Sequence, residues 1–576
     1  MSSTDKDSNK VVLSRRGFLK AGGVAVGTVV LGGVAGCGKD DTKIVTVNPT
    51  NSSCSGSDEL PGRSYTFQSD KYGTDAPVSF VSGTIPSSSI TKTYSCDVVV
   101  VGAGQFGGCA AASALDQGAN VIMIEKMSSG RAAGVDFAVV NAPVQTAAGI
   151  TLNVDDLVHE LNAISSYRSR PELHMMWATK SAEALAWYEG VVQSKGYVGA
   201  TTTTATKHGW GQLEFPTNLN FSLGAGDRIA ALATYITNKG GTILYNTPAC
   251  QLIRTSSTGP VTGVIAKASG GNYIQINATS VILATGGYEA NTARMMKYIT
   301  HGDMAFYSSG AIGENAGDGH EMGLAVGAYE QDSQHALLID PGGILGTEAI
   351  VGFPPMLLFL MGTPLMRVSV NGRRFTNEDL PVSGISALNA TLPKFCHWVV
   401  FDSNLASTLN QIGSGSTYST YTANIAGLLS AGDAVQANDL GELAQKMNVD
   451  VDAFTDEVTR YNGFVAAGSD DDFHLNPAYL AAIATPPFTA VRNGTNMLCS
   501  VCGLMVNRYS QVIQPDGNII SGLYAGGNCA GGFYTTSYPH SVPGHSLGRC
   551  MTFGYLAGMH ATNGTITRIA KTTRNT

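Results

Sequence analysis

A glycine-rich turn near residue 100 carries the first sign of chemistry in this sequence. Gly102, Gly104 and Gly107 have the spacing G-x-G-x-x-G, and Glu125 follows after about 20 residues. In this arrangement the first glycine permits a tight turn, the second lets backbone approach a pyrophosphate, and the third lets a helix pack on a strand. An acidic side chain at that distance accepts hydrogen bonds from ribose hydroxyls. The spacing therefore predicts a dinucleotide-binding site.

The segments around this turn have the patterns of the elements that must position it. Residues 97–101 read Asp-Val-Val-Val-Val, which is typical of a strand buried on both faces. The alanine-rich segment 108–118 predicts a helix, and residues 121–124 predict a second buried strand that ends at Glu125. The helix N-terminus would point its N–H groups at the phosphates. The glycine motif therefore has the strand–turn–helix–strand context that a dinucleotide site requires.

Further motifs follow along the chain. They are Glu125-Lys126 with the glycine-rich loop 130–134, Asn246-Thr247-Pro248-Ala249 after a strand, the strand and glycine turn 280–288, Asn315-Ala316-Gly317-Asp318-Gly319 at a helix start, the strand and turn 519–528, and Ser546-Leu547-Gly548 at the start of a closing helix. In this order they resemble the fumarate reductase / 3-oxosteroid 1-dehydrogenase family of FAD enzymes. The resemblance covers the chain from Cys96 to about Thr562.

The resemblance implies FAD as the cofactor. The N-terminus of the closing helix would face the pyrimidine edge of the flavin and stabilise negative charge on the reduced ring. Arg131 departs from the family's glycine-rich flavin loop, as do the two alanines after it, and Asn528 replaces the commoner acid. The implied cofactor-binding residues are Ala103, Gly104, Gln105, Phe106, Gly107, Glu125, Lys126, Gly130, Ala132, Ala133, Ala249, Thr285, Gly286, Asp318, Asn528, Ser546 and Leu547.

The same resemblance implies the fold. We expect an α/β, Rossmann-like FAD-binding domain of the glutathione reductase type with an inserted α+β capping domain. Residues 94–339 and 486–576 would form the FAD-binding domain, and residues 340–485 the cap. The segment 370–378 resembles the family's entry to the cap. Such a cap closes over the flavin and shields hydride transfer from water.

The substrate is inferred from what distinguishes the two branches of this family. Fumarate reductases have an arginine a few residues after an Asn-Glu pair, which protonates the substrate, and another shortly before the final helix. Here residues 378–383 and 538–544 contain no arginine. A dicarboxylate would therefore lack the bidentate partners that it needs, and fumarate is not the expected substrate.

The segment before the closing helix resembles instead the tyrosine-containing turn of 3-oxosteroid 1-dehydrogenases. In that branch a tyrosine and a glycine N–H polarise a ketone oxygen. Gly544 matches the glycine, and either Tyr538 or His540 takes the place of the tyrosine, depending on the alignment. His545 is a further candidate for contact with flavin or substrate. We expect hydride exchange between flavin N5 and the carbon β to a carbonyl, assisted by Tyr538 or His540.

The N-terminus has the pattern of an export signal. Arg15-Arg16 precedes a weakly hydrophobic, glycine-rich stretch, which predicts a Tat signal peptide over residues 1–36. That stretch ends in a segment that resembles a bacterial lipobox, which predicts lipidation of Cys37. Residues 37–93 would form a flexible tether. We therefore expect a lipid-anchored protein at the cell membrane or cell surface.

An exported flavoprotein lies outside the cytoplasmic NAD(P)H pool, so its electrons would come from a donor protein or a quinol-linked chain at the membrane. This favours reduction of an activated C=C bond in an enone or a steroid-like unsaturated compound. A steroid-type dehydrogenase that introduces a double bond is the alternative. A fumarate- or acrylate-type reductase and a non-catalytic flavin-binding lipoprotein are further alternatives.

Composition restricts the remaining classes. The net charge is −8 without a basic block beyond the N-terminus, so no nucleic-acid partner is expected. The ten cysteines are scattered, which argues against a disulfide scaffold. Cys499-Ser-Val-Cys502 is the only CxxC and could be a redox pair or half of a metal site. An iron–sulfur cluster is an alternative, but we expect buried free thiols and predict no metal site.

Overall fold

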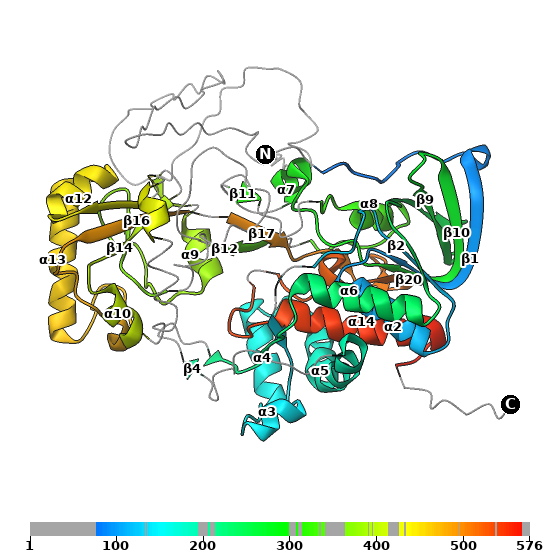
Figure 1. Cartoon of the computed structure of the whole chain (residues 1–576), viewed down its shortest axis with the longest axis horizontal. Helices are drawn as coiled ribbons and strands as arrows, with labels where there is room; N and C mark the ends of the chain where they lie inside the picture. The colour runs from blue at the N-terminus through cyan, green and yellow to red at the C-terminus, as the bar shows by residue number, and fades with distance from the viewer. Residues whose placement is uncertain are drawn as a thin grey trace, which may run out of the picture. The chain divides into compact units, whose positions relative to one another are not determined.

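The computed structural model describes residues 76–566 except 133, 135, 194–205, 208–212, 299–306, 309–313, 333–335, 340–362, 390, 394–395, 413–424, 431, 433, 495 and 536–537 (Figure 1). The predicted signal peptide, Cys37 and most of the expected tether lie outside these residues, as does Ala133.

The largest sheet is built around the strand that precedes the glycine turn. Its order is β19-β20-β10-β1-β2-β7, with β9 beside β10 and β8 beside β9. The valines of β1 are buried because β1 lies inside the sheet, in parallel register with β2 and β10. The strands are β1 (Ile90–Val101), β2 (Val121–Ile124), β7 (Thr242–Leu244), β8 (Ala249–Arg254), β9 (Val261–Lys267), β10 (Tyr273–Leu283), β19 (Gln511–Ile513) and β20 (Ile519–Ala525).

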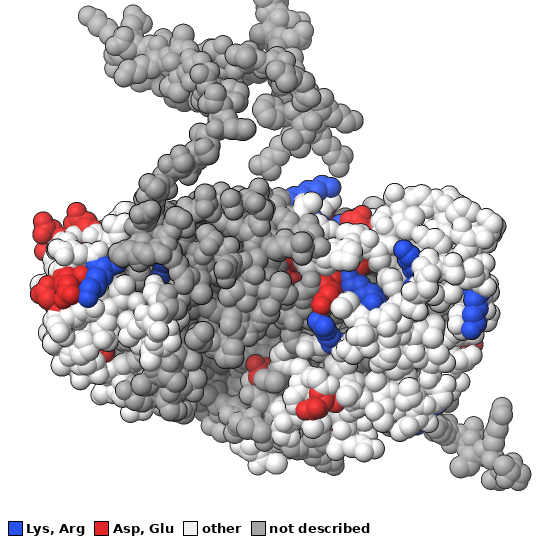
Figure 2. Space-filling model, turned by 45° about the horizontal axis from the view of Figure 1, so that its top comes forward, with Lys and Arg blue, Asp and Glu red and all other residues white. Residues whose placement is uncertain are grey.

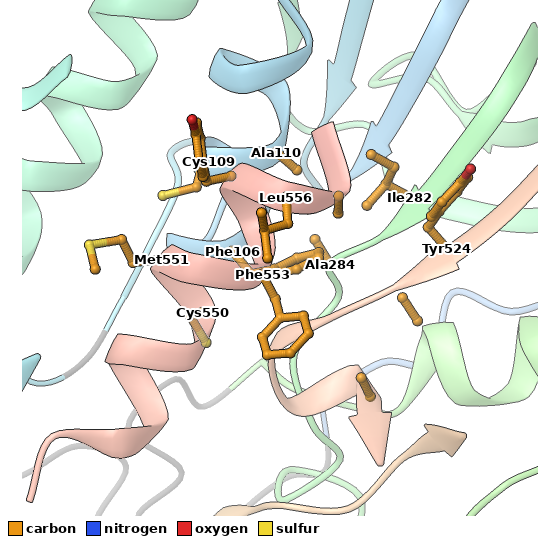
Figure 3. Packing of buried hydrophobic residues seen from close by; sticks show 14 of the residues in the cluster. Phe106, Cys109, Ala110, Ile282, Ala284, Tyr524, Cys550, Met551, Phe553 and Leu556 are labelled. Atoms are coloured by element: carbon orange, nitrogen blue, oxygen red, sulfur yellow. The ribbon is translucent and has the colours of Figure 1, made fainter. Parts of the chain in front are cut away.

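Two helices from opposite ends of the chain pack side by side over this sheet (Figure 1). They are α2 (Gln105–Asp116), which starts three residues before the expected helix, and α14 (His545–Asn563). A Cβ at Gly558 would lie 2.4 Å from the carbonyl oxygen of Ala110, so glycine is needed for this close approach. Figure 3 shows Phe106 and Ala110 of α2 in one apolar core with Phe553 and Leu556 of α14.

Shorter elements complete the part of the chain around this sheet. They are η1 (Ser87–Ser89), β3 (Asp136–Ala138), α3 (Pro143–Ala147), α4 (Val154–Ile164), α5 (Pro171–Val192), β4 (Thr206–Lys207), β5 (Leu213–Glu214), β6 (Asn218–Asn220), α6 (Ala225–Asn238), α7 (Thr292–Tyr298), α8 (Asp318–Ala325), β18 (Leu504–Met505), η7 (Gly527–Cys529) and β21 (Ala530–Gly531). A separate three-stranded sheet has the order β11-β17-β12, from Tyr307–Ser308, Asn496–Ser500 and Ala336–Ile339.

The insertion forms an α+β unit with its own core, as expected. Its antiparallel sheet has the order β13-β14-β16-β15. Because β16 is paired on both sides, the expected cap boundary at residue 485 is wrong: the sheet continues to Gly494. The elements are β13 (Arg367–Ser369), α9 (Val382–Asn389), β14 (Cys396–Phe401), α10 (Leu405–Gln411), β15 (Ala434–Ala437), α12 (Leu440–Met447), α13 (Val451–Ala467), η6 (Pro477–Tyr479) and β16 (Phe488–Gly494).

The segment before the first strand also differs from expectation. The N–H of Ala76 donates to the carbonyl of Ala290, and the N–H of Val81 donates to the carbonyl of Cys250, at 2.9 and 3.0 Å. Strand β1 begins at Ile90 rather than near residue 97, because its first half pairs with β10. The expected tether end at residue 93 is therefore wrong, since residues 76–93 belong to the part of the chain that contains the largest sheet.

The described cysteines are free thiols. Six of the eight, Cys502 included, are buried as expected, whereas Cys96 and Cys499 are half-buried. Where the chain is described, no three or more His, Cys, Asp or Glu side chains are grouped to hold a metal ion. None of the described helices combines the length and hydropathy needed to cross a membrane. On the face that Figure 2 shows, neutral residues make up most of the described surface.

Candidate active site

The glycine turn lies at the carboxyl end of β1, and its shape depends on having no side chains. A Cβ at Gly102, whose φ is +110°, would lie 2.4 Å from the carbonyl oxygen of Ala284. A Cβ at Gly107 would lie 2.0 Å from the carbonyl oxygen of Gly102. At Gly104 the nearest atom would be 3.4 Å away, on Arg131. Gly102 and Gly107 thus shape the turn, while a side chain at Gly104 would enter the space in front of it.

That space is a groove at the carboxyl ends of β1, β2 and β10. Such an edge of a parallel sheet is the usual position of a nucleotide in this kind of fold. The groove is lined by Ser79, Val101, Gly102, Gly104, Ile124, Glu125, Lys126, Met127, Arg131, Thr247, Ala249, Ala284, Thr285, Gly286, Glu314, Asn315 and Asp318. Seven predicted cofactor-binding residues are among them, namely Gly104, Glu125, Lys126, Ala249, Thr285, Gly286 and Asp318.

The Glu125 side chain connects the glycine turn to the segment that follows β2 by hydrogen bonds. Its Oε2 accepts the N–H of Ala103 at 2.8 Å, and its Oε1 accepts the N–H of Met127 at 2.9 Å. Two charge-assisted bonds hold the carboxylate in one orientation. Each oxygen keeps further acceptor capacity, so the carboxylate can still receive hydroxyl groups from a ligand in the groove.

Ion pairs form the opposite wall. Lys126 Nζ lies 3.0 Å from Asp318 Oδ2, and Arg131 Nη1 lies 2.7 Å from Glu314 Oε1. Asp318 Oδ1 also accepts the N–H of Ser79 at 2.6 Å. Ser79 was missed from the sequence because its segment has tether-like composition, and no motif marks it.

Six other predicted cofactor residues occupy two places outside this groove. Gln105, Phe106 and Gly107 are buried in the first turn of α2. Asn528, Ser546 and Leu547 are half-buried at η7 and in the first turn of α14. A Cβ at Gly134 would lie 3.1 Å from Leu547 Cδ1, so the glycine-rich loop that begins at Gly130 and continues through Ala132 faces the start of α14.

The start of α14 packs closely against β3. Gly544 is its N-cap with φ +81°, and a Cβ there would lie 2.7 Å from the nitrogen of Ala138. The carbonyl of Gly544 accepts the N–H of Ala138 at 2.9 Å. One residue into the helix, the N–H of Ser546 donates to the hydroxyl oxygen of Tyr538 at 3.1 Å. This bond places the phenol directly at the helix N-terminus.

Tyr538 belongs to an aromatic cluster at that point. Its ring centroid lies 5.2 Å from that of Tyr534 and 5.3 Å from that of His540. The structure therefore brings together Tyr538, His540 and Gly544, the three predicted catalytic residues. Burial raises the pKa of the Tyr538 phenol above its usual range, so that side chain keeps its proton.

His545 lies beneath this cluster. It is fully buried, its Nδ1 shares a 2.7 Å hydrogen bond with the hydroxyl of Tyr534, and its ring packs edge-on at 4.4 Å against Trp177. Burial lowers its pKa well below the usual value, so the imidazole is neutral. His174, next to it on α5, is also buried. Sequence reasoning missed Trp177 and His174 because α5 is remote in sequence and carries no motif.

Arg549 was also missed, although it is the only Lys, Arg, Asp or Glu in the closing helix. It is 2% exposed. Its Nη1 donates to the carbonyl of Gly527 at 3.1 Å and its Nη2 to Asn528 Oδ1 at 2.8 Å. The guanidinium carbon lies 4.7 Å from the ring centroid of Phe533 and 5.0 Å from that of Tyr534.

Comparison with protein families matches residues 97–543 to the FAD binding domain family, which is well over half of the chain. The chain belongs to this family. The vinyl phenol reductase of Lactiplantibacillus plantarum is 29% identical to it over 495 residues, covering 82% of this chain and 97% of that protein. Fumarate reductase (cytochrome) of Shewanella frigidimarina is 25% identical over 472 residues, covering 81% and 76%.

Among solved structures, 3-ketosteroid delta1-dehydrogenase from Sterolibacterium denitrificans superposes with a TM-score of 0.64 at 18% identity, covering 82% of this chain and 100% of that chain. This likeness concerns the fold and confirms the expected class, a Rossmann-like FAD-binding domain with an additional antiparallel-sheet domain. FAD is the cofactor of this protein. The protein is an oxidoreductase that acts on CH–CH groups, which means a reductase or dehydrogenase of C=C bonds.

The described residues fit FAD. The free space in front of Gly104 suits a pyrophosphate, and the carboxylate of Glu125 suits ribose hydroxyls. The positive end of α14 suits the flavin ring. The individual cofactor-binding assignments, in the groove as well as at η7 and in the first turn of α14, stay predictions.

Proposed function

We propose that this protein is an exported FAD-dependent reductase of an activated C=C bond, in which Tyr538 assists protonation of the substrate. The observation that carries the proposal is the Tyr538 phenol, held by the N–H of Ser546 at the start of α14. Gly544 is the N-cap of the same helix. A neutral donor beside a helix N-terminus suits a carbonyl oxygen that gains negative charge during reduction.

Bound FAD would supply the hydride, from its N5 atom, to the carbon β to the carbonyl. The residues of the chain would bind the carbonyl oxygen and supply the proton. The N–H of Gly544, for which the described residues offer no acceptor, would donate to the carbonyl oxygen. Tyr538 would donate its proton to the same oxygen, because burial keeps the phenol protonated at neutral pH. The enol so formed would become the saturated ketone when a proton moves from its oxygen to the α carbon.

Tyr538 fits the role of donor better than His540. Its hydroxyl oxygen accepts a backbone N–H, which orients the group and makes its own O–H a stronger donor. The His540 ring lies edge-on to Tyr538 at 5.3 Å, where it supports the orientation of the phenol. His540 is thus proposed as a positioning residue.

The proposed substrate carries no carboxylate at the reacting end. Arg549 is the arginine of the closing helix, but it is 2% exposed and both terminal nitrogens already donate to the η7 loop. It is therefore not placed to clamp a carboxylate in bidentate fashion. The similarity to a vinyl phenol reductase supports an unsaturated substrate of low polarity, such as an enone. In a vinyl phenol, the phenol oxygen conjugated to the vinyl group would take the place of the carbonyl oxygen. The alternative, formation of a double bond in a steroid ketone, uses the same tyrosine.

An anaerobic reoxidation panel tests the proposal. The flavin of the purified protein is reduced and then mixed with enones, a vinyl phenol, acrylate, fumarate and a saturated 3-oxosteroid. We expect enones or the vinyl phenol to restore the oxidised flavin spectrum, and Tyr538→Phe to slow that step about 100-fold or more. Reoxidation by fumarate alone would refute the substrate assignment. Reduction of oxidised flavin by the saturated steroid, without reoxidation by any enone, would favour the dehydrogenase.

Export and anchoring form a separate part of the proposal. The twin arginine, Arg15-Arg16, and Cys37 would place the enzyme at the membrane, where a donor protein or a quinol-linked chain would supply electrons. Fractionation of cells that express the full chain tests this. We expect the protein in the membrane fraction, Cys37→Ser to release it into the extracytoplasmic fraction, and replacement of Arg15-Arg16 by Lys-Lys to retain it in the cytoplasm. Equal distribution of all three would refute it.

A further inference from the structure

Arg549 is a buried cation for which the described residues provide no carboxylate partner. Its two terminal nitrogens donate to neutral acceptors, the carbonyl of Gly527 and the side-chain oxygen of Asn528. Its Nε is buried without an acceptor among the described residues. The other close groups are the faces of Phe533 and Tyr534, which attract a cation weakly.

A fully buried positive charge is costly unless an opposite charge compensates it. Arg294 and Arg374, two other buried arginines, follow that rule. Arg374, for example, lies 2.7 Å from a carboxylate oxygen of Glu378 and 2.8 Å from one of Asp470. Arg549 differs from these two because its compensation comes from dipoles and ring faces. The same holds for the buried Arg228, whose terminal nitrogens donate to the carbonyls of Leu223 and Gly134. The surroundings of Arg549 therefore suit a bound group that carries negative charge during part of the reaction cycle.

The charge of Arg549 acts on the whole cluster at the start of α14. Burial raises the pKa of Tyr534, Tyr538, Cys499 and Cys550, and the guanidinium opposes that rise in each. Burial lowers the pKa of His174 and His545, and the guanidinium adds to the lowering. The guanidinium thus favours negative charge over positive charge throughout this region.

The partners of Arg549 place it at the flavin end of the cofactor site. Gly527 and Asn528 follow β20, which lies beside β10 and so ends at the same sheet edge as the groove. Both are half-buried, as are Ser546 and Leu547 in the first turn of α14. Leu547 in turn faces the glycine-rich loop at Gly134. A flavin between that loop and α14 would therefore lie close to the guanidinium.

We propose that Arg549 provides the countercharge for the reduced flavin, so that it raises the reduction potential of the bound FAD. In this role it adds a full positive charge to the partial positive charge at the N-terminus of α14. Asn528 is part of the arrangement, because a neutral amide orients the guanidinium without cancelling its charge. Arg549 thus acts through its charge on the reduced flavin. The inference does not depend on which C=C substrate the enzyme takes.

Sulfite titration of the purified, oxidised holoprotein tests this without any substrate. Sulfite adds through sulfur to flavin N5 and leaves negative charge on the pyrimidine ring, so its dissociation constant reports how well the site stabilises that charge. We expect Arg549→Gln to weaken sulfite binding at least tenfold and Arg549→Lys to stay within threefold of the wild type. A tenfold change corresponds to about 30 mV for a two-electron couple, which a dye-coupled redox titration would measure independently.

Two further variants keep the test decisive. Asn528→Asp is nearly isosteric and would neutralise Arg549 in place, so it should also weaken sulfite binding about tenfold even if Arg549→Gln fails to retain FAD. Arg254→Gln removes an arginine that is likewise held by backbone carbonyls, but on β8, and should leave sulfite binding unchanged. The proposal is overturned if Asn528→Asp and any folded Arg549→Gln bind sulfite within threefold of wild type. It is also overturned if Arg549→Lys loses affinity as fully as Arg549→Gln.

Discussion

Replacement of Gly544 by alanine would perturb the active site at its most constrained backbone position. Gly544 caps α14 with φ +81°, a conformation that costs an alanine about 1–2 kcal/mol. The new Cβ would also lie 2.7 Å from the nitrogen of Ala138 and 2.8 Å from the carbonyl carbon of Phe137. An ordinary contact begins at 3.4 Å, so α14 and β3 must separate by about 0.7 Å.

Overpacking of this kind typically adds about 1–3 kcal/mol, which brings the expected loss for Gly544→Ala to about 2–5 kcal/mol. A matched control lies at the other end of the same helix. Gly564 has φ +68°, but a Cβ there would have no neighbour within 4 Å. Gly564→Ala should therefore lose only the backbone term, about 1–2 kcal/mol. The difference between the two variants isolates the contact with β3.

The two variants should differ even more in catalysis. A displacement approaching 1 Å at a reacting group can cost about 100-fold in rate, and Gly544 lies in the proposed donor site. Anaerobic stopped-flow measurement of flavin reoxidation, with urea unfolding of the same holoprotein, gives both quantities. We expect reoxidation to slow by about 10- to 100-fold in Gly544→Ala and to be unchanged in Gly564→Ala. Equal stability and equal rates in the two variants would refute the claim that β3 fixes the start of α14.

Three other outcomes are expected. Glu125→Gln should raise the FAD dissociation constant about tenfold or more in a fluorescence titration, because a charged acceptor of two backbone N–H groups is lost; unchanged affinity would contradict that role. In Tyr538→Phe, FAD affinity should be unchanged while turnover falls, and wild-type turnover should not decline up to pH 10, since burial raises the phenol pKa. Burial lowers the pKa of four histidines, to about 3 for His174 and His320 and well below the usual 6.5 for His397 and His545. The unfolded chain therefore binds protons at these histidines below pH 6.5, whereas the folded chain does not. The free energy of unfolding should then fall by up to about 5 kcal/mol per pH unit. In urea unfolding between pH 7 and 5, His320→Gln should reduce that slope by about a quarter.

The parts of the fold that depend on local pattern were predictable from sequence. The valine run of β1, the strand that ends at Glu125 and the glycine turn between them each follow from spacing and residue type. The boundaries at residues 93 and 485 were wrong because pairing between distant segments decides them. Residues 76–93 are composed like a linker but are held by β10 and Asp318. Strand β16 completes a sheet whose first strand begins about 120 residues earlier.

The candidate site shows the same division. Motif residues such as Gly104 and Asp318 line the groove, as expected. Ser79, Trp177 and Arg549 did not emerge from the sequence, because their roles arise from contacts across more than 160 residues or from burial of a charge, which spacing does not encode. A lone charged residue in an otherwise uncharged closing helix is the one sequence signal that could have drawn attention to Arg549.

A single anaerobic turnover tests the central claim most directly. The holoprotein is reduced to completion, mixed with one equivalent of a conjugated enone or vinyl phenol, and the flavin spectrum and the organic product are followed together. We predict that flavin reoxidation yields one saturated product per FAD and that the rate constant falls about 100-fold or more in Tyr538→Phe. Reduced flavin that persists with every uncharged unsaturated acceptor, while fumarate reoxidises it at once, would contradict the account.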